Sequence, residues 1–330
     1  MALANVHGGA NFLFEPGSNP AHLGHELAYL ASGFRQLLGT QKQKREQQDH
    51  EDLSATDVEH VKDRTPEHDG LPHSGLWRGW GRSVGQAVPV TRLPSLRPPI
   101  GFAHRGAKAH APENTMEAFE LALRLGASGL ESDVWITADG VAVLDHDGLV
   151  GRRPLRRPIS QSPSADLPRH IPTLREFYEV VGRSVEFSLD IKDPAAAAEV
   201  VACARDVGAE DRLWLCHPDR HLVSSWRELS SEVHLVESTR ASKFEGSPEL
   251  HIAQSAELGI DVINLHHSDW TGGSVAMAHR FGLLAFGWDA QFDRILDELL
   301  DCGIDGVYSD HVDTMMASIA KITGGDYSGT

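Results

Sequence analysis

From residue 99 onward, short β-type segments alternate with helical segments, and this repeat constrains the fold more than any other feature of the sequence. Eight strand–helix units in about 225 residues have the length and order of a (β/α)8 barrel, the TIM barrel, an α/β fold. An open, doubly wound sheet fits less well, because no glycine-rich dinucleotide loop follows the first segment. The predicted strands cover 100–104, 129–135, 185–191, 212–216, 233–237, 261–266, 283–288 and 305–309, and the predicted helices cover 115–125, 173–182, 195–207, 219–229, 248–258, 272–281, 291–301 and 312–322.

The repeat is interrupted after the second predicted strand. The stretch ITADGVAVLDHD is typical of a hairpin whose two-residue turn is Asp139-Gly140. In that register Asp133 lies opposite His146 on the returning strand. Residues 147–172 are polar and rich in arginine and proline, so we expect a small insertion there before the next helix.

Residues 1–97 have no place in the repeat, and we expect a barrel domain over 98–325 preceded by an N-terminal extension. Residues 21–38 carry leucines at helical spacing and predict an amphipathic helix. Its apolar face needs a partner, either the barrel or a second copy of the chain in a homodimer. Residues 41–70 contain 14 charged residues and too little apolar surface to offset the entropy of ordering, so we expect a mobile segment, followed by a linker.

The charge balance and the cysteines restrict the partners and the compartment. The 330 residues include 30 Lys and Arg against 47 Asp and Glu, a formal charge of −17, which argues against binding to nucleic acid or to an anionic membrane. No apolar run approaches the roughly 18 residues of a spanning helix, and the N-terminus lacks a secretion signal, so we expect no stable membrane insertion. Cys203, Cys216 and Cys302 are too scattered for a disulfide framework or a zinc site. We expect a cytoplasmic protein.

Polar side chains gather where the predicted strands end. In barrels of this kind the active site lies at the C-terminal ends of the strands. A packed core does not tolerate so much charge without partners, so we expect a site there. Its main candidates are His104, Arg105, Glu131, Asp133, His146, Asp190 and Lys192, and its secondary candidates are Asn114, His217, Glu237 and Trp288.

The acidic candidates predict a metal site. Glu131 and Asp133 are two residues apart on a strand, so their carboxylates point to the same face and repel each other unless a cation neutralises them. Asp190 on the neighbouring predicted strand adds a third oxygen ligand. Three carboxylates without a nearby cysteine favour one hard divalent cation, Mg²⁺ or Ca²⁺.

The basic candidates predict chemistry on a phosphate. His104 and His146 come from different strands, and two histidines about a phosphate can act as a general base and a general acid near neutral pH. Arg105 and Lys192 supply positive charge for the non-bridging phosphate oxygens. Asn114 precedes the helix that begins at Thr115, so it is expected either to cap that helix or to take part in the site.

Taken together, residues 104–147 resemble the opening of the glycerophosphodiester phosphodiesterase (GDPD) family, within the PI-PLC-like superfamily of TIM-barrel phosphodiesterases. The family pattern of HRG, PENT, Glu-x-Asp, Thr-x-Asp-Gly and His-Asp is present in order. Glu131, Asp133 and His146 follow His104 by 27, 29 and 42 residues, the family spacing. Weaker similarity continues through SLDIK, FGWDAQ and GIDGVYSDHVD, over roughly residues 100–320.

The resemblance implies a TIM barrel that hydrolyses glycerophosphodiesters to sn-glycerol 3-phosphate and an alcohol such as choline or ethanolamine. It also implies roles for seven residues, with the divalent metal on Glu131, Asp133 and Asp190, the acid/base pair at His104 and His146, and the phosphate near Arg105 and Lys192.

Three departures from the family pattern leave alternatives for the substrate. Asp190 replaces the usual Glu and is similar to the aspartate of the spider-toxin type sphingomyelinases D, His217 stands where Ser is common, and Asp289 and Gln291 stand where Thr and Asn often follow the tryptophan. One alternative is therefore a phospholipase D-like activity on lysophospholipid or sphingomyelin. The non-enzymatic alternative is a catalytically lapsed barrel that binds phosphorylated polyols, although the retained histidines and carboxylates argue against it.

Overall fold

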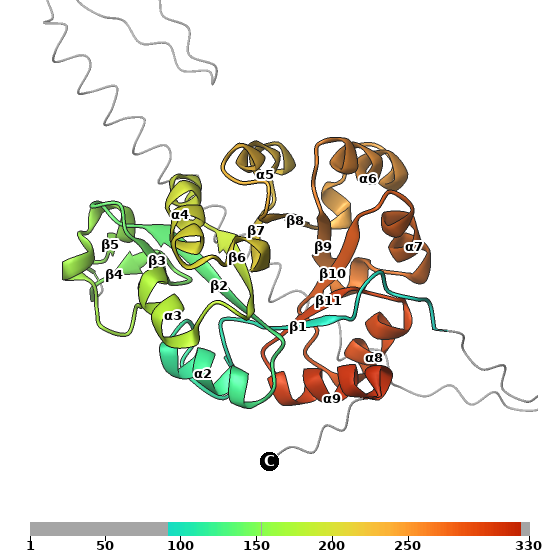
Figure 1. Cartoon of the computed structure of the whole chain (residues 1–330), viewed down its shortest axis with the longest axis horizontal. Helices are drawn as coiled ribbons and strands as arrows, with labels where there is room; N and C mark the ends of the chain where they lie inside the picture. Colours follow the sequence, from blue (N-terminus) through green and yellow to red (C-terminus); the bar gives the residue numbers. More distant parts are fainter. Residues whose placement is uncertain (1–91, 153, 325–330) are drawn as a thin grey trace, which may run out of the picture. The chain divides into compact units, whose positions relative to one another are not determined.

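A closed barrel of eight parallel strands forms the centre of the structure, a computed structural model that describes residues 92–152 and 154–324 (Figure 1). Neighbouring strands pair in the order β1, β11, β10, β9, β8, β7, β6, β2, and the pairing of β1 with β2 closes the ring. The predicted TIM barrel is confirmed. The strands are β1 (Ile100–Ala103), β2 (Gly129–Ile136), β6 (Glu186–Ile191), β7 (Leu213–His217), β8 (His234–Thr239), β9 (Val262–His266), β10 (Leu284–Trp288) and β11 (Gly306–Ser309).

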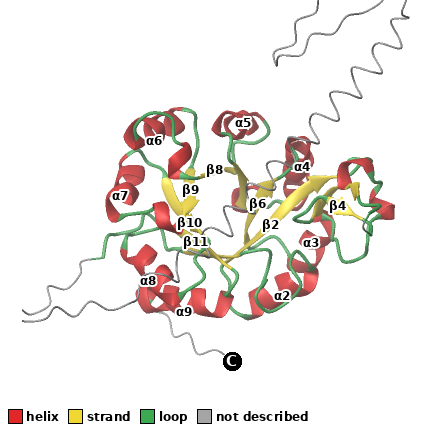
Figure 2. Ribbon diagram, turned by 180° about the vertical axis from the view of Figure 1, so that it is seen from behind, coloured by secondary structure: helices red, strands yellow, loops and turns green. Residues whose placement is uncertain are grey.

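Helices follow the barrel strands and lie outside them (Figure 2). Each begins within two residues of its predicted start. Thr173, for example, caps α3 with a capping box to Glu176. None of the helices in residues 92–152 and 154–324 has both the length and the apolar character needed to span a membrane. The α-helices are α2 (Met116–Arg124), α3 (Leu174–Val181), α4 (Ala197–Val207), α5 (Arg220–Ser225), α6 (Pro248–Glu257), α7 (Gly272–Arg280), α8 (Asp293–Asp301) and α9 (Val312–Thr323).

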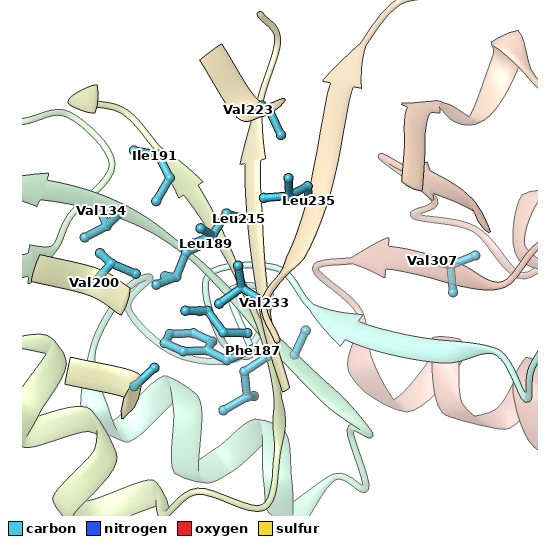
Figure 3. Packing of buried hydrophobic residues seen from close by; sticks show 14 of the residues in the cluster. Val134, Phe187, Leu189, Ile191, Val200, Leu215, Val223, Val233, Leu235 and Val307 are labelled. Atoms are coloured by element: carbon cyan, nitrogen blue, oxygen red, sulfur yellow. The ribbon is translucent and has the colours of Figure 1, made fainter. Parts of the chain in front are cut away.

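Two apolar layers hold the barrel together. Between strands and helices, Leu189, Leu215 and Leu235 pair side by side on β6, β7 and β8 and pack in one buried cluster with residues of the surrounding helices (Figure 3). A second cluster fills the barrel interior, where the Phe102 ring stacks on Tyr308 at 4.7 Å between centroids and meets Trp214 edge-on. These residues close the interior, so polar side chains on the same inward faces gather farther along the strands.

The hairpin after β2 has a different register from the one predicted. Strand β3 (Ala142–Leu144) pairs antiparallel with β2, Val134 opposite Leu144, and the backbone N–H of Asp145 donates to the carbonyl of Asp133 at 3.0 Å. Asp133 therefore lies opposite Asp145, and the predicted pairing with His146 was wrong.

A three-residue turn, Ala138-Asp139-Gly140, causes this shift, where a two-residue turn was predicted. The Thr137 N–H donates to the Val141 carbonyl at 3.0 Å, and the Thr137 hydroxyl accepts from the Val141 N–H at 2.9 Å. Gly140 completes the turn with φ +81°, a left-handed backbone that glycine adopts without strain.

The predicted insertion lies between the hairpin and α3. It contains a two-stranded sheet of β4 (Leu149–Val150) and β5 (Arg157–Pro158), followed by the 3₁₀ turns η1 (Ile159–Gln161) and η2 (Ser164–Asp166). The Asp139 carboxylate ties it to the hairpin, because it accepts hydrogen bonds from the Ser164 N–H and hydroxyl at 2.8 and 2.7 Å.

The predicted helix over 21–38 and the charged segment over 41–70 lie outside the described residues. The limits of the barrel domain at residues 98 and 325 and the homodimer stay predictions.

We predict that Asp139→Ala loosens the insertion in a pH-dependent way. Hydrogen bonds from the Thr137 hydroxyl and from Ser164 lower the pKa of Asp139 to about 2. A carboxylate with a depressed folded-state pKa stabilises the fold above its unfolded-state pKa, roughly 3.9, and the contribution is lost as the pH falls towards the folded value. Urea unfolding should show that the variant has a smaller free energy of unfolding than the wild type at pH 7, and that this difference narrows below about pH 4. A difference in the free energy of unfolding that does not change with pH would contradict this account.

Candidate active site

The three acidic candidates meet on the inward face of β2 and β6. Asp133 pairs directly with Asp190 across the two strands, and Glu131 lies two residues before Asp133 on the same face. Asp190 in turn pairs with Cys216, a member of the interior cluster, so this face points into the barrel. Glu131 and Asp133 retain only 6% and 2% of their surface exposed, so both carboxylates are almost completely removed from water.

Asp133 is the most heavily compensated of these acids. Its Oδ1 lies 3.1 Å from the Lys192 ammonium, and its Oδ2 lies 3.2 Å from the Arg105 Nε and accepts from the Asn114 amide at 3.1 Å. Burial alone raises the pKa of Asp133, but Lys192, Arg105, His146 and the Asn114 hydrogen bond together hold it below the ordinary value. Asp133 is therefore charged, with positive groups on both sides.

Glu131 has much weaker compensation. Its Oε2 accepts the backbone N–H of Arg105 at 2.8 Å and lies 3.8 Å from the His104 Nε2. Burial raises the pKa of Glu131 to about 7, because these partners do not offset desolvation and the nearby charge of Asp133. An additional cation beside Glu131 would stabilise its ionised form.

His104 follows β1 directly and is held from both sides. Its Nδ1 hydrogen-bonds Asp310, and its Nε2 faces Glu131. Burial by itself lowers the pKa of His104, but Glu131 and Asp310 outweigh it, so the pKa lies above the ordinary value. Asp310, which follows the last strand, is the main site residue that the sequence interpretation left without a role.

The loop after β1 reaches the site through strained backbone. Arg105 and Asn114 adopt left-handed φ angles of +51° and +54°, which cost energy in residues with a Cβ and often occur at functional sites. Asn114 is buried, accepts from the Ser132 hydroxyl at 2.7 Å and donates to Asp133. The predicted capping role of Asn114 was wrong: Thr115 caps α2, its hydroxyl accepting from the Ala118 N–H.

Lys192 and Arg105 are both engaged with acids in this structure. The Lys192 ammonium bridges Asp133 and Asp190, and the Arg105 guanidinium also bonds Glu113 at 3.0 Å. The two predicted phosphate ligands are thus beside the carboxylates, and their charge raises the local potential for an anionic ligand.

His146 is less enclosed than His104. Its side chain is 39% exposed, and its Nδ1 lies 3.1 Å from the Asp147 carboxylate, which in turn lies 3.6 Å from Arg156 of the insertion. His146 still belongs to the electrostatic surroundings of the site, because its charge contributes to the lowered pKa of Asp133.

The remaining secondary candidates, His217, Trp288 and Glu237, have different surroundings. His217 pairs with Glu237 and follows Cys216 of the interior cluster, so it takes the outward face, where its ring meets Trp226 edge-on and its Nδ1 accepts the Asp219 N–H at 3.0 Å. Burial lowers its pKa, and the charge of Asp190 opposes that shift. Trp288 lies at the end of β10, where its ring contacts His266 and the Arg240 guanidinium. Glu237 was wrongly placed in the site.

Glu237 points outward from β8 toward α6. Its buried carboxylate accepts from the Ser255 hydroxyl at 2.7 Å and pairs with the His251 Nε2 at 2.7 Å. The β-type alternation explains the error, since neighbouring Val236 belongs to the interior cluster and Glu237 therefore takes the opposite face.

The fold and the site together define a class of protein, the TIM-barrel enzymes. Buried carboxylates, a carboxylate-held histidine and two cations converge at the end of the barrel where such enzymes place their chemistry.

Comparison with known proteins identifies the family. A model of the glycerophosphoryl diester phosphodiesterase family matches residues 104–314, and the chain belongs to that family and is a phosphodiesterase. A glycerophosphodiester phosphodiesterase from Caldanaerobacter subterraneus subsp. tengcongensis is 22% identical over 243 residues, 67% of this chain and 97% of the relative.

Solved structures share the fold. A putative glycerophosphoryl diester phosphodiesterase from Silicibacter pomeroyi has a TM-score of 0.60 at 22% identity, covering 71% of this chain and 96% of the other. An Oleispira antarctica phosphodiesterase, solved in complex with the product sn-glycerol-3-phosphate, has a TM-score of 0.57 at 22% identity, covering 67% and 96%.

We predict that Asn114→Ala destabilises the barrel by about 1–3 kcal/mol, because the buried Ser132 hydroxyl loses its acceptor and Asp133 loses a donor. Alanine at a left-handed position adds a cost of about 1–2 kcal/mol that glycine avoids. Asn114→Gly is therefore the matched control and should be the less destabilised of the two in urea unfolding. Equal stability of both variants and the wild-type protein would show that the Asn114 hydrogen bonds contribute nothing.

Proposed function

We propose that this phosphodiesterase hydrolyses glycerophosphodiesters to sn-glycerol 3-phosphate and an alcohol such as choline or ethanolamine, with one divalent cation, Mg²⁺ or Ca²⁺. The observation that carries the proposal is the convergence of Glu131, Asp133 and Asp190 on one inward face beside His104. Membership of the family and the product named for the Oleispira antarctica relative support the substrate class.

The donor set fits a hard divalent cation. Glu131, Asp133 and Asp190 are the residues that would hold it, and the raised pKa of Glu131, to about 7, marks a buried carboxylate that lacks sufficient positive charge. When bound, such an ion neutralises the carboxylates, polarises the phosphate and makes a coordinated hydroxyl group more acidic.

His104 is suited to move a proton at its Nε2. The Asp310 carboxylate accepts the Nδ1–H hydrogen bond, which fixes the ring orientation and stabilises the protonated ring. His146 is the proposed partner, giving or taking the second proton from the hairpin side of the site. Arg105 and Lys192 would exchange part of their carboxylate contacts for the non-bridging oxygens of the phosphate.

Two polar side chains contact the Trp288 ring, which suits a water-soluble diester. A lipid substrate would need an apolar surface at the mouth, whereas the Arg240 guanidinium lies over the Trp288 ring, 5.7 Å from its centroid, and the His266 ring meets the indole edge-on. Arg240 is itself paired with Asp269 at 2.8 Å. The indole thus has polar neighbours, and these contacts give the phospholipase D-like alternative no support.

We predict that His104→Ala and His146→Ala each lower kcat/KM for glycerophosphocholine by roughly 10²–10⁴-fold. EDTA should abolish glycerol 3-phosphate release, and adding Mg²⁺ or Ca²⁺ back should restore it. His221→Ala, an exposed histidine on α5, is the matched control and should retain full activity. Full turnover in either alanine variant of the proposed pair would rule the mechanism out, and greater turnover of lysophospholipid would favour the lipid alternative.

We predict that Asp310→Asn lowers kcat by about 10-fold or more while KM changes little, since this residue positions His104 rather than the substrate. Removing the carboxylate also removes a cause of the raised pKa of His104. The limb of the pH–rate profile that His104 controls should therefore move to lower pH. An unchanged profile with a lower rate would indicate that Asp310 supports only the structure.

A further inference from the structure

Two histidines and an aspartate form a separate group on the surface, which we call the surface histidine cluster: His110, His311 and Asp313. His110 lies in the loop between β1 and α2, and His311 and Asp313 lie at the start of α9. None of the three belongs to the proposed catalytic set.

The ligand atoms of this cluster already converge. One ligating atom from each side chain lies within 4.8 Å of the other two, and the His110 Nε2 is 3.3 Å from the Asp313 Oδ1. The two imidazole rings are nearly perpendicular, at 88°, with centroids 6.3 Å apart. Two imidazole nitrogens and one carboxylate oxygen around a common point are typical ligands of zinc and related ions, with water completing the coordination.

The side chains of the cluster are available for an ion. Within residues 92–152 and 154–324, the His311 ring nitrogens accept and donate no hydrogen bond, and the His110 ring bonds only Asp313. An ion would therefore replace one exposed contact rather than break a network.

A second histidine group in the same structure lacks this availability. His266, His267 and Asp289 also converge within 4.8 Å. However, the His266 Nδ1 accepts the Ser268 N–H at 3.2 Å, and its Nε2 pairs with Asp289 at 3.2 Å. Because the Nδ1 lone pair accepts a backbone N–H, the neutral His266 ring carries its proton on Nε2 and has no lone pair left for an ion. In the part of the chain that the structure describes, neither ring of the surface histidine cluster accepts a backbone N–H.

We propose that the surface histidine cluster binds one transition-metal ion of the zinc class, with at least one water ligand, and thereby fastens the β1–α2 loop to α9. The loop already contacts the segment that leads from β11 into α9, because the Ala109 N–H donates to the Asp310 carbonyl at 3.2 Å and Lys108 lies 3.5 Å from the Asp310 carboxylate. The ligand chemistry separates this site from the proposed catalytic one, since imidazole favours zinc whereas three carboxylates favour Mg²⁺ or Ca²⁺.

The test uses the full chain saturated with Mg²⁺ and titrated with Zn²⁺ in equilibrium dialysis, with Co²⁺ absorption as a second readout. His311→Ala should bind one zinc equivalent fewer than the wild-type protein and lose the visible bands of Co²⁺ bound at this site. His221→Ala removes a surface histidine elsewhere and should bind as the wild type does. The comparison between variants cancels zinc bound at any other position of the chain.

Two controls keep the outcome interpretable. His311→Ala should retain diester hydrolysis within about two-fold, so loss of zinc binding is distinguishable from failure of the proposed function. Thermal unfolding without zinc should match the wild type, and added zinc should raise the midpoint of the wild-type protein more than that of the variant. Equal zinc stoichiometry and affinity in the wild type and His311→Ala would overturn the proposal.

Discussion

The burial of two like charges on one strand is the constraint on which the rest of the site depends. Glu131 and Asp133 lie on the inward face of β2 with almost no exposed surface. Moving one carboxylate out of water is expensive, and a second one nearby adds repulsion. The surrounding residues can therefore be understood by how they neutralise this face: Lys192 and Arg105 flank Asp133, and Glu131 is left with a backbone N–H and an imidazole.

This constraint also accounts for the strained loop after β1. Arg105 presents its backbone N–H to Glu131 and its guanidinium to Asp133 from a left-handed conformation, and Asn114 reaches Asp133 from another. Such strain costs about 1–3 kcal/mol per residue and persists when the contacts around it over-determine the geometry. The barrel therefore holds the loop after β1 in a strained conformation that keeps Arg105 and Asn114 beside the acids, which is consistent with the proposed phosphate chemistry.

The sequence predicted the barrel and most of the site because periodicity and local motifs report directly on faces of strands. The eight strands and the facing of Glu131, Asp133 and Asp190 needed only the two-residue repeat. The hairpin register depended instead on the length of the turn. Because Thr137 closes a turn of three residues rather than two, Asp145 rather than His146 lies opposite Asp133. Asp310 and the Asn114 contacts were not predictable, because they join segments distant in the sequence.

The two proposed catalytic histidines are held by different parts of the structure. His104 is held within the barrel by Asp310, whose backbone continues directly from β11. His146 is attached to the insertion through Asp147 and Arg156, whose side chains are both more exposed than those of His104 and Asp310. A displacement of the insertion would thus move one proposed proton carrier while the other and the acidic face stay fixed. Substitutions in residues 147–172 should consequently alter which alcohol is accepted more than they alter the chemistry at phosphorus, since they change the His146 side of the site without touching the charges that β2 requires.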